Sequence, residues 1–569
     1  MSGQGPGPAP DRDRERLLAQ ATAWRAEDPD PRTVGQLDDL LVRVRDGDAD
    51  ALAELGGAFS GPLEFGTAGL RGPMGPGPAR MNRVVVIRAS AGLARYLLDT
   101  GRSAGPVLVG HDARHGSAAF ARDTAATIAG HGLDVLLVDG PIPTPVVAYG
   151  IRALGCVAAV VVTASHNPAP DNGYKVYLGD GSQIVPPADA RIAARIAEAG
   201  ALPLATLPRS DDWRDAGPEL LDGYVARAAG LVAALPAALS ASASRRLRWV
   251  YTPMHGVGLA TVRRVVRAAG LPEPAVVEAQ ADPDPDFPTV AFPNPEEPGA
   301  LDLAMGLARE VGADLVVAND PDADRCAVAV PRPEGWRMLR GDELGALLGA
   351  DLLRRGVAGT YASSVVSSTL LATMARAAGA PYVTTLTGFK WIGRVPGLVY
   401  GYEEALGYCC DPAAVADKDG ITTLVRVLDL AGRLADEGRT LTDLLDDVMR
   451  THGLHATDQL AFRSDRVEVI SGAMQRLRTS MPATLGGEPL TVTDLAAGTA
   501  DLPATDAVVL QGGTLRVVVR PSGTEPKLKC YLEVRSAPEA SVDLEAARIL
   551  AAGRLRVLRT EVAEALGLG

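Results

Sequence analysis

Short, uninterrupted runs of apolar residues constrain the fold of this chain more than any other feature. The first three span residues 107–110, 135–138 and 157–162. Runs of this length without polar alternation are typical of strands buried on both faces, as in a parallel sheet that helices cover. Because helical apolar spacing fills the stretches between them, residues 84–205 predict strands and helices that alternate around a mostly parallel sheet.

The same alternation returns twice before the pattern changes near residue 455. The further strand candidates are 248–251, 275–277, 314–318, 365–366, 382–384 and 398–400. Two longer strand candidates, 515–519 and 528–534, and a helical stretch at 539–566 follow them. The sequence therefore predicts three α/β domains with mixed, mostly parallel sheets and a smaller C-terminal α+β domain.

We place the expected domain boundaries where the pattern shifts. This division gives an N-terminal tail with bracing helices in 1–56, α/β domains in 57–205, 206–330 and 331–455, and an α+β domain in 456–569.

Composition excludes several classes of function. The chain has 569 residues, and no apolar run approaches the 18 or so residues that a membrane helix needs. Its start lacks the apolar core of a secretory signal, so we expect a cytoplasmic protein. The net charge of -13, without a block of Lys and Arg, argues against a nucleic-acid partner. The five cysteines show no CxxC pair, which suits a reducing compartment and predicts buried packing residues.

Three aspartates follow directly after the strand candidate at 314–318. Asp320, Asp322 and Asp324 would repel one another strongly unless a cation lay among them. Oxygen ligands without His or Cys favour Mg²⁺ over zinc. An EF-hand would need Gly at the position of Arg325 and Glu at that of Pro331, so this motif does not fit. A solvated acidic turn is the alternative.

Ser165 lies just beyond the apolar run 157–162, in the stretch TASHNP. Ligands gather beyond the carboxyl ends of strands in parallel sheets, so this serine is a candidate nucleophile or phosphate carrier. His166 could be its base in a hydrolase, but the GxSxG elbow is missing and sequence neighbours rarely have the geometry of a triad. We therefore expect His166 mainly to support the loop.

Two glycine-containing loops could bind an anion. GTAGLRG places glycines around Arg71, and RPSGTEP offers a guanidinium, hydroxyls and an open backbone that can hold the oxygens of a phosphate. Its candidate residues are Arg520, Ser522, Gly523 and Thr524. A plain turn between strands is the alternative for RPSGTEP.

Lysine is rare in this chain and lies in or beside the polar loops. Only five of the 56 basic residues are Lys, namely Lys175, Lys390, Lys418, Lys527 and Lys529. Because burial can tune the proton affinity of Lys but not of Arg, proton transfer is a reason to keep it. In GFKWIG, Gly388 and Lys390 suit a carbohydrate and its phosphate, and Glu403 with Glu404 could accept hydrogen bonds from sugar hydroxyls or form a solvated turn.

Taken together, GTAGLRG, TASHNP, DPDADR, GYEEALGY and RPSGTEPK resemble, in order and spacing, the α-D-phosphohexomutase superfamily of phosphoglucomutases and phosphomannomutases. The match runs from about residue 60 to 536. The resemblance implies four domains around a central cleft, the first three related in topology. It also implies a phosphosugar substrate, Mg²⁺, and a sugar 1,6-bisphosphate as intermediate and activator. We expect a monomer or weak homodimer.

The same resemblance implies a role for each site residue. Ser165 would be the phosphoserine, its phosphate completing the Mg²⁺ shell of the three aspartates. Arg71 and Arg325 would steady the transferring phosphoryl group, and Lys175 and Lys418 would be general acid/base candidates. Glu403 would bind sugar hydroxyls, while Arg520, Ser522, Gly523 and Thr524 would hold the other phosphate. The implied reaction interconverts a sugar 1-phosphate and 6-phosphate, with glucose first and mannose or pentose phosphates as alternatives.

Three positions depart from the common family pattern. Pro321 stands where Gly is common, Ala405 where Ser is common, and Gly407-Tyr408 where many phosphomannomutases have His. These forms look like the branch with the second type of phosphoglucomutase and the phosphopentomutases. A phosphatase that releases the phosphate, and a sensor in which Ser165 is idle, are the alternatives from other classes.

Overall fold

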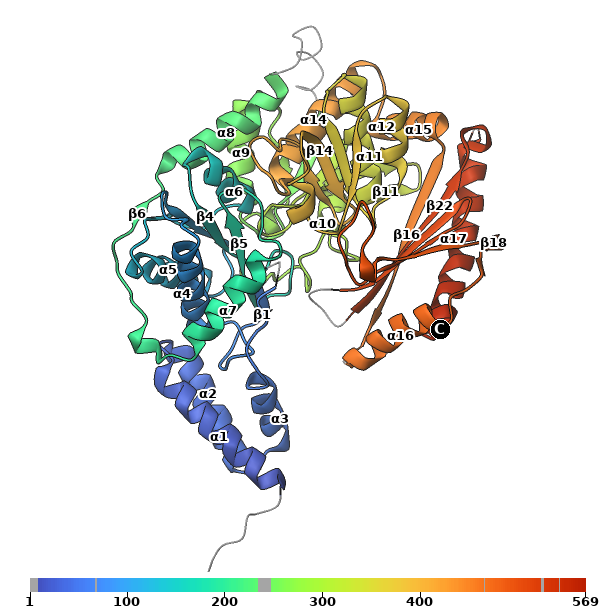
Figure 1. The fold of residues 1–569 in the computed structure, drawn as a ribbon. Helices are drawn as coiled ribbons and strands as arrows, with labels where there is room; N and C mark the ends of the chain where they lie inside the picture. The colour runs from blue at the N-terminus through green and yellow to red at the C-terminus, as the bar shows by residue number, and fades with distance from the viewer. Residues whose placement is uncertain are drawn as a thin grey trace, which may run out of the picture.

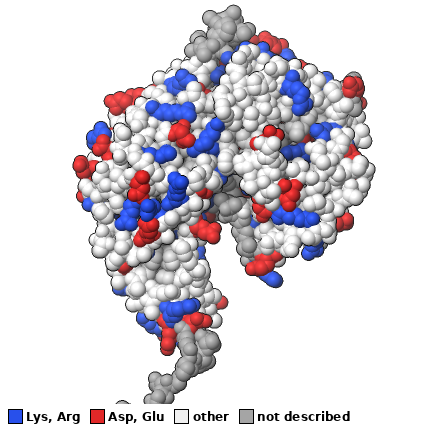
Figure 2. Space-filling model, in the orientation of Figure 1, with Lys and Arg blue, Asp and Glu red and all other residues white. Residues whose placement is uncertain are grey.

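The computed structural model describes residues 9–66, 69–233, 247–464, 466–522, 527–541 and 543–568. Four main β-sheets with their helices follow one another along this part of the chain (Figure 1). The predicted fold class, three α/β domains and a C-terminal α+β domain, is confirmed. The surface is hollowed between the first domain and the C-terminal domain, as Figure 2 shows.

The first sheet has the strand order β1-β5-β4-β2-β3-β6. Its strands are β1 (Leu70–Pro73), β2 (Val107–His111), β3 (Val135–Leu137), β4 (Ala158–Val162), β5 (Asp171–Leu178) and β6 (Arg214–Asp215). The helices α4 (Arg83–Asp99), α5 (Ser117–Gly130), α6 (Thr144–Ala153) and α7 (Ala188–Gly200) accompany it. Every residue of β2 and β4 is buried, as expected for apolar strands in the middle of a covered sheet.

The second sheet has the order β11-β10-β9-β7-β8. Its strands are β7 (Trp249–Thr252), β8 (Ala275–Val276), β9 (Leu315–Ala318), β10 (Ala327–Arg332) and β11 (Gly335–Met338), with α8 (Pro218–Ala233), α9 (Gly258–Ala268) and α10 (Asp302–Val311). The third sheet has the order β13-β12-β14-β15. Its elements are β12 (Thr360–Ser364), β13 (Tyr382–Thr385), β14 (Leu398–Glu403) and β15 (Gly407–Cys409), with α11 (Gly341–Arg354), α12 (Leu370–Ala377), α13 (Phe389–Ile392), α14 (Gly420–Asp436) and α15 (Leu441–His452).

One local motif recurs in these three sheets. In each, a strand with one parallel neighbour is followed by an antiparallel partner, giving the pairs β4–β5, β9–β10 and β14–β15. The turns of these pairs carry Ser165, the aspartate cluster and Glu404 respectively. The three polar loops therefore occupy the same topological position in successive sheets.

The C-terminal sheet is fully antiparallel, with the order β16-β22-β21-β20-β19. Its strands are β16 (Leu454–Arg463), β19 (Thr491–Asp494), β20 (Val508–Gln511), β21 (Leu515–Pro521) and β22 (Lys527–Ser536), and α16 (Val467–Thr479) and α17 (Leu544–Leu566) pack beside it. A separate two-stranded sheet joins β17 (Thr484–Leu485) to β18 (Glu488–Pro489). The α+β character predicted after residue 455 is thus present.

Three helices precede the first sheet, as the sequence predicts. They are α1 (Ala9–Glu27), α2 (Pro31–Arg45) and α3 (Ala49–Ala58), and they extend away from the first domain in Figure 1. Leu37, Leu41 and Leu55 form the centre of their own small core. Arg88 of α4 donates to Glu27 at 2.9 Å, which ties the helices to the first domain. Among the described helices, none is both long and apolar enough to cross a membrane.

The sheets extend beyond two of the expected domain boundaries. β6 pairs with β3 although it lies after residue 205, and β11 pairs with β10 although both reach beyond residue 330. Both are edge strands without an apolar run, so hydrophobic patterning does not reveal them. We propose boundaries after β6 and after β11 instead. The strand expected at 365–366 is also displaced, because β12 ends at Ser364 and these residues form a turn.

A buried carboxylate joins the third sheet to the C-terminal sheet. Glu533 on β22 accepts hydrogen bonds from Ser368 Oγ at 2.7 Å, Thr369 N at 2.8 Å and Thr369 Oγ1 at 2.9 Å. His455 Nδ1 lies 3.0 Å from the same carboxylate. Burial favours the neutral form of Glu533, but its contacts with His455 and Ser368 lower its pKa to about 2.

We predict that Glu533→Gln loosens this junction. The loss of hydrogen bonds to a charged acceptor should cost about 2–3 kcal/mol and speed amide hydrogen exchange in β16 and β22 at neutral pH. Because the pKa of Glu533 is lowered, its contribution is present above the ordinary value of 4.5 and is lost as the pH falls towards about 2. The exposed substitution Glu539→Gln is the control, and equal exchange in both variants would contradict this role.

Candidate active site

Ser165 lies in a strained turn directly after β4. Its φ of 52° is in the left-handed region, which non-glycine residues seldom adopt, and the residue is 2% exposed. Its backbone N–H donates to Thr163 Oγ1 at 2.9 Å, which helps to hold this turn. Its hydroxyl donates to Asp320 Oδ2 at 2.8 Å, so the serine and the first aspartate meet across two domains.

His166 lies closer to the serine hydroxyl than the sequence argument suggests. Its Nδ1 is 3.2 Å from Ser165 Oγ, because the left-handed turn brings the two neighbouring side chains together. Burial, and then the positive charges of Arg325 and Arg71, lower the pKa of His166 well below its usual value. The ring is therefore neutral near pH 7, and we retain the prediction that it supports the loop.

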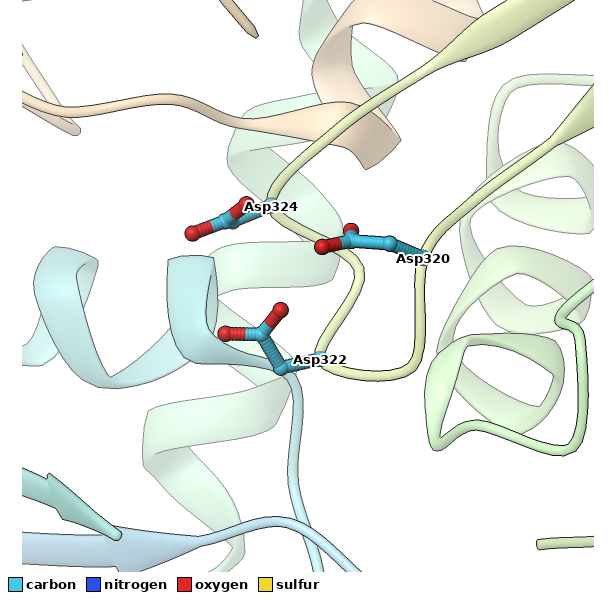
Figure 3. Close-up of side chains that lie close together, drawn as sticks. All are labelled: Asp320, Asp322 and Asp324. Carbon is cyan, nitrogen blue, oxygen red and sulfur yellow. The ribbon is translucent and has the colours of Figure 1, made fainter. Parts of the chain in front are cut away.

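The three predicted aspartates form one buried cluster. One carboxylate oxygen from each lies within 4.8 Å of the others, and Figure 3 shows the three side chains around a common space. Burial, followed by repulsion from Asp322 and Asp324, raises the pKa of Asp320 well above its usual value. Asp322 Oδ1 and Asp324 Oδ1 are buried without a hydrogen-bond partner. Hard oxygen donors with this unmet demand fit a divalent cation such as Mg²⁺.

Two lysines from different domains face the cluster. Lys175 Nζ on β5 donates to Asp322 Oδ2 at 2.6 Å and to Asp324 Oδ2 at 2.7 Å. Lys418 Nζ lies 3.4 Å from Asp324 Oδ2. Burial opposes their charged forms, but attraction to the aspartates outweighs it and raises the pKa of both lysines. The two lysines that the resemblance implies as acid/base candidates therefore both contact Asp324 Oδ2.

Arg325 connects the aspartate loop to the loop of Glu403. Its Nη1 donates to Ala405 O at 3.0 Å, and the next residue, Cys326, donates its N–H to Leu406 O at 3.1 Å. Its Nε is 3.8 Å from Asp320 Oδ2, a long ion-pair contact. Glu403 is buried nearby, and burial raises its pKa although Lys418 opposes the shift.

Gly407 explains how this loop and Lys418 fit together. A Cβ at Gly407 would lie 2.5 Å from Lys418 Cδ and 3.0 Å from Glu403 Cγ. A side chain would therefore displace the lysine. This close approach gives a steric reason for glycine at residue 407.

Arg71, Gly388 and Lys390 lie on or beside two other elements. Arg71 on β1 donates to Asn167 Oδ1 at 3.2 Å, which places it against the Ser165 loop. Gly388 has a φ of 106° and precedes Lys390 on α13. Burial lowers the pKa of Lys390 to about 8, assisted by the charges of Arg520 and Arg394 although Asp189 opposes the shift.

The RPSGTEP loop is described in part. Arg520 lies on β21 and Ser522 follows that strand. Gly523 and Thr524 lie outside the described residues, so their role stays a prediction.

Sequence reasoning missed two residues that hold the site together. Arg114 donates to the carbonyls of the Ser165 loop, and Thr144 Oγ1 donates to Asp322 Oδ2 at 2.7 Å. Arg114 comes shortly after β2 and Thr144 begins α6, so both follow strand ends of the first sheet. The strand-end rule that identified Ser165 could also have drawn attention to Arg114.

Four family models match successive parts of the chain. They are the phosphoglucomutase/phosphomannomutase α/β/α domains I, II and III, at residues 62–202, 222–335 and 340–452, and the C-terminal domain at 487–551. The chain belongs to the phosphoglucomutase/phosphomannomutase family. The predicted superfamily is thus confirmed, and the protein is a phosphomutase, an intramolecular phosphotransferase.

Individual relatives of this phosphomutase carry several substrate names. A probable phosphomannomutase of Haemophilus influenzae is 44% identical, over 81% of this chain and 95% of the relative. A probable phosphoribomutase of Schizosaccharomyces pombe is 38% identical, over 90% and 92%, and the human phosphopentomutase is 36% identical, over 85% and 87%. A putative phosphomannomutase structure from Thermus thermophilus is 27% identical, with a TM-score of 0.66, over 86% of this chain and 99% of that one. These names include the phosphopentomutase-like branch that the departures indicate.

We predict that Asp322→Asn weakens binding of divalent cations to this phosphomutase. The change keeps the size of the side chain but removes a negative charge from the cluster, so affinity for Mg²⁺ should fall at least about 10-fold. Calorimetric titration with Mg²⁺ measures the effect. Asp211→Asn, at an exposed position, is the control, and an unchanged affinity in Asp322→Asn would exclude the cluster as the metal site.

Proposed function

We propose that this phosphomutase interconverts a sugar 1-phosphate and its 6-phosphate, with glucose 1-phosphate as the first substrate, through a phosphoserine at residue 165. The observation that supports this assignment most is the contact of Ser165 Oγ with Asp320 Oδ2 at 2.8 Å. This contact lies in a buried carboxylate cluster in which two oxygens have no hydrogen-bond partner. A serine in this position can carry a phosphoryl group beside a cation. A serine hydrolase would instead need an acidic residue that orients His166 as the base.

The reaction consists of two transfers in opposite directions. In the first, the P–O bond to Ser165 breaks while a bond to the free sugar hydroxyl forms, which gives a sugar bisphosphate. After the bisphosphate reorients in the site, its other phosphoryl group is transferred to Ser165. Such transfers depend chiefly on positioning and charge neutralisation. Mg²⁺ held by Asp320, Asp322 and Asp324 would supply positive charge at the phosphoryl oxygens.

The surrounding side chains have distinct parts in this scheme. Arg71 contacts Asn167 in the Ser165 loop, and Arg325 lies 3.8 Å from Asp320 Oδ2; both would stabilise the phosphoryl oxygens. Lys175 and Lys418 both contact the aspartate cluster and would exchange protons with the attacking and leaving hydroxyls. Glu403 would bind sugar hydroxyls, with Gly388 and Lys390 beside the sugar phosphate. Arg520, Ser522, Gly523 and Thr524 would hold the phosphate that is not being transferred.

Pentose phosphates are the second candidate substrates. The relatives named phosphoribomutase and phosphopentomutase share 38% and 36% identity over most of both chains. Ala405 also lacks a hydroxyl that could contact a hexose. A phosphomannomutase assignment has its support in the 44% identical relative.

A coupled assay tests the mutase mechanism directly. With glucose 1-phosphate, Mg²⁺ and a trace of glucose 1,6-bisphosphate, we expect formation of glucose 6-phosphate. Ser165→Ala should lower kcat at least about 1,000-fold because it removes the phosphoryl carrier, while substrate binding stays largely intact. The exposed Ser103→Ala is the control. Release of free phosphate would indicate a phosphatase, and a fully active Ser165→Ala would exclude the phosphoserine mechanism.

Substrate choice follows from kcat/KM for the 1-phosphates of glucose, mannose, ribose and deoxyribose. We expect glucose 1-phosphate to be preferred, and Ala405→Ser to change the hexose-to-pentose ratio by about 10-fold because it adds a hydrogen-bonding group beside the sugar. Ala413→Ser, exposed in a following loop, is the matched control. A wild-type preference for a pentose phosphate would replace glucose by the second candidate.

A further inference from the structure

Phe287 belongs to the second domain but lies against Arg114, a residue of the first. Its ring centre is 4.9 Å from the guanidinium carbon of Arg114, and the residue is 4% exposed. Its φ is 46°, a conformation that is unfavourable for a bulky residue. Such outliers persist only where the surrounding structure compensates for them, and they cluster at functional sites.

Arg114 determines the shape of the Ser165 turn. Its Nη2 donates to the carbonyls of Ser165 at 2.6 Å and Asn167 at 2.5 Å. Its Nη1 donates to the carbonyls of Pro168 at 2.9 Å and Asp171 at 3.2 Å. A planar guanidinium can bridge four carbonyls in this way only if its own plane is fixed. Residues 165–171 therefore depend on the orientation of one side chain.

Two groups, one from each of two domains, hold Arg114 in place. Asp112, in its own domain, lies 3.3 Å from its Nε with both side chains almost fully buried. Phe287, from the second domain, covers the guanidinium. An aromatic face over a desolvated guanidinium is attractive by electrostatics as well as by packing. The second domain thus completes the support of the first domain's serine.

The segment that carries Phe287 is itself anchored on both sides. His255 Nε2 lies 2.8 Å from Thr289 Oγ1, which fixes the segment to its own domain. His115 Nε2 lies 2.7 Å from Asp286 Oδ1, which links it to the first domain. Further along, Phe292 lies 6.2 Å from His166, measured between ring centres. The segment 286–292 therefore extends from the loop of Arg114 to His166, and Phe287 is its buried residue.

We propose that Phe287 is a positioning residue for the phosphoryl transfer, acting through Arg114 on the geometry of Ser165. This inference rests on the phosphoserine mechanism proposed above. With the turn held, the P–O bond to Ser165 breaks as the bond to the sugar hydroxyl forms. With the turn loosened, water competes as acceptor and the same P–O bond breaks to give free serine and inorganic phosphate. Phe287 thereby favours transfer over hydrolysis.

Four proteins test the proposal: the wild type, Phe287→Ala, Phe287→Leu and Phe287→Tyr. We expect Phe287→Ala to lower kcat about 10-fold, equivalent to about 1.4 kcal/mol, with KM changed less than about twofold because Phe287 is not a substrate ligand. The same variant, phosphorylated with glucose 1,6-bisphosphate, should lose its phosphoserine to water several-fold faster. Phe287→Tyr keeps the aromatic face and should restore both values, whereas Phe287→Leu keeps only apolar packing and should restore neither.

An activity-independent measurement separates this proposal from the proposed function. Hydrogen exchange of the peptide 163–173 needs no substrate, and we expect it to be faster in Phe287→Ala and Phe287→Leu than in the wild type and Phe287→Tyr. Failure of the wild type to convert any sugar phosphate would exclude the function but leave this measurement valid. Wild-type exchange and phosphoserine lifetime in Phe287→Ala, or full restoration by Phe287→Leu, would overturn the proposal.

Discussion

Repulsion among three buried carboxylates is the constraint on which the rest of this structure depends. Asp320, Asp322 and Asp324 lie in one five-residue turn, where their charges could not remain together in a low-dielectric interior without compensation. Lys175 from the first domain and Lys418 from the third compensate this negative charge. The aspartate cluster therefore binds positively charged side chains from the neighbouring domains. The resulting site could not be formed by one domain alone.

Strained backbone conformations occur in the loops around the aspartate cluster. Six non-glycine residues of the described chain have a left-handed φ: Ser165, Met254, His255, Phe287, Ala323 and Leu406. Each lies in a loop that carries or contacts the site. Left-handed backbone aims side chains and carbonyls in directions that ordinary turns do not reach, at a cost of about 1–3 kcal/mol each.

Much of the fold and part of the site could be predicted because they follow from local patterns. Apolar runs such as 157–162 are strands buried on both faces, and Ser165 and Asp320 lie directly after such strands. The strand-end position of Arg114 is visible in the sequence, but its role is not, because it donates to backbone carbonyls more than fifty residues away. The contact of His166 with Ser165 also depends on one unusual φ angle. The edge strands β6 and β11 were not predicted because they have no apolar run.

The link between the aspartate loop and the loop that follows Glu403 has a consequence for how residue 405 can change. Arg325 and Cys326 hold that loop through the carbonyls of Ala405 and Leu406, not through their side chains. Hydrogen bonds to the main chain are indifferent to residue identity. The Ala405 side chain, which is partly exposed, can therefore vary during evolution while the loop keeps its path. Divergence in substrate within such a lineage need not disturb the chemistry that its members share.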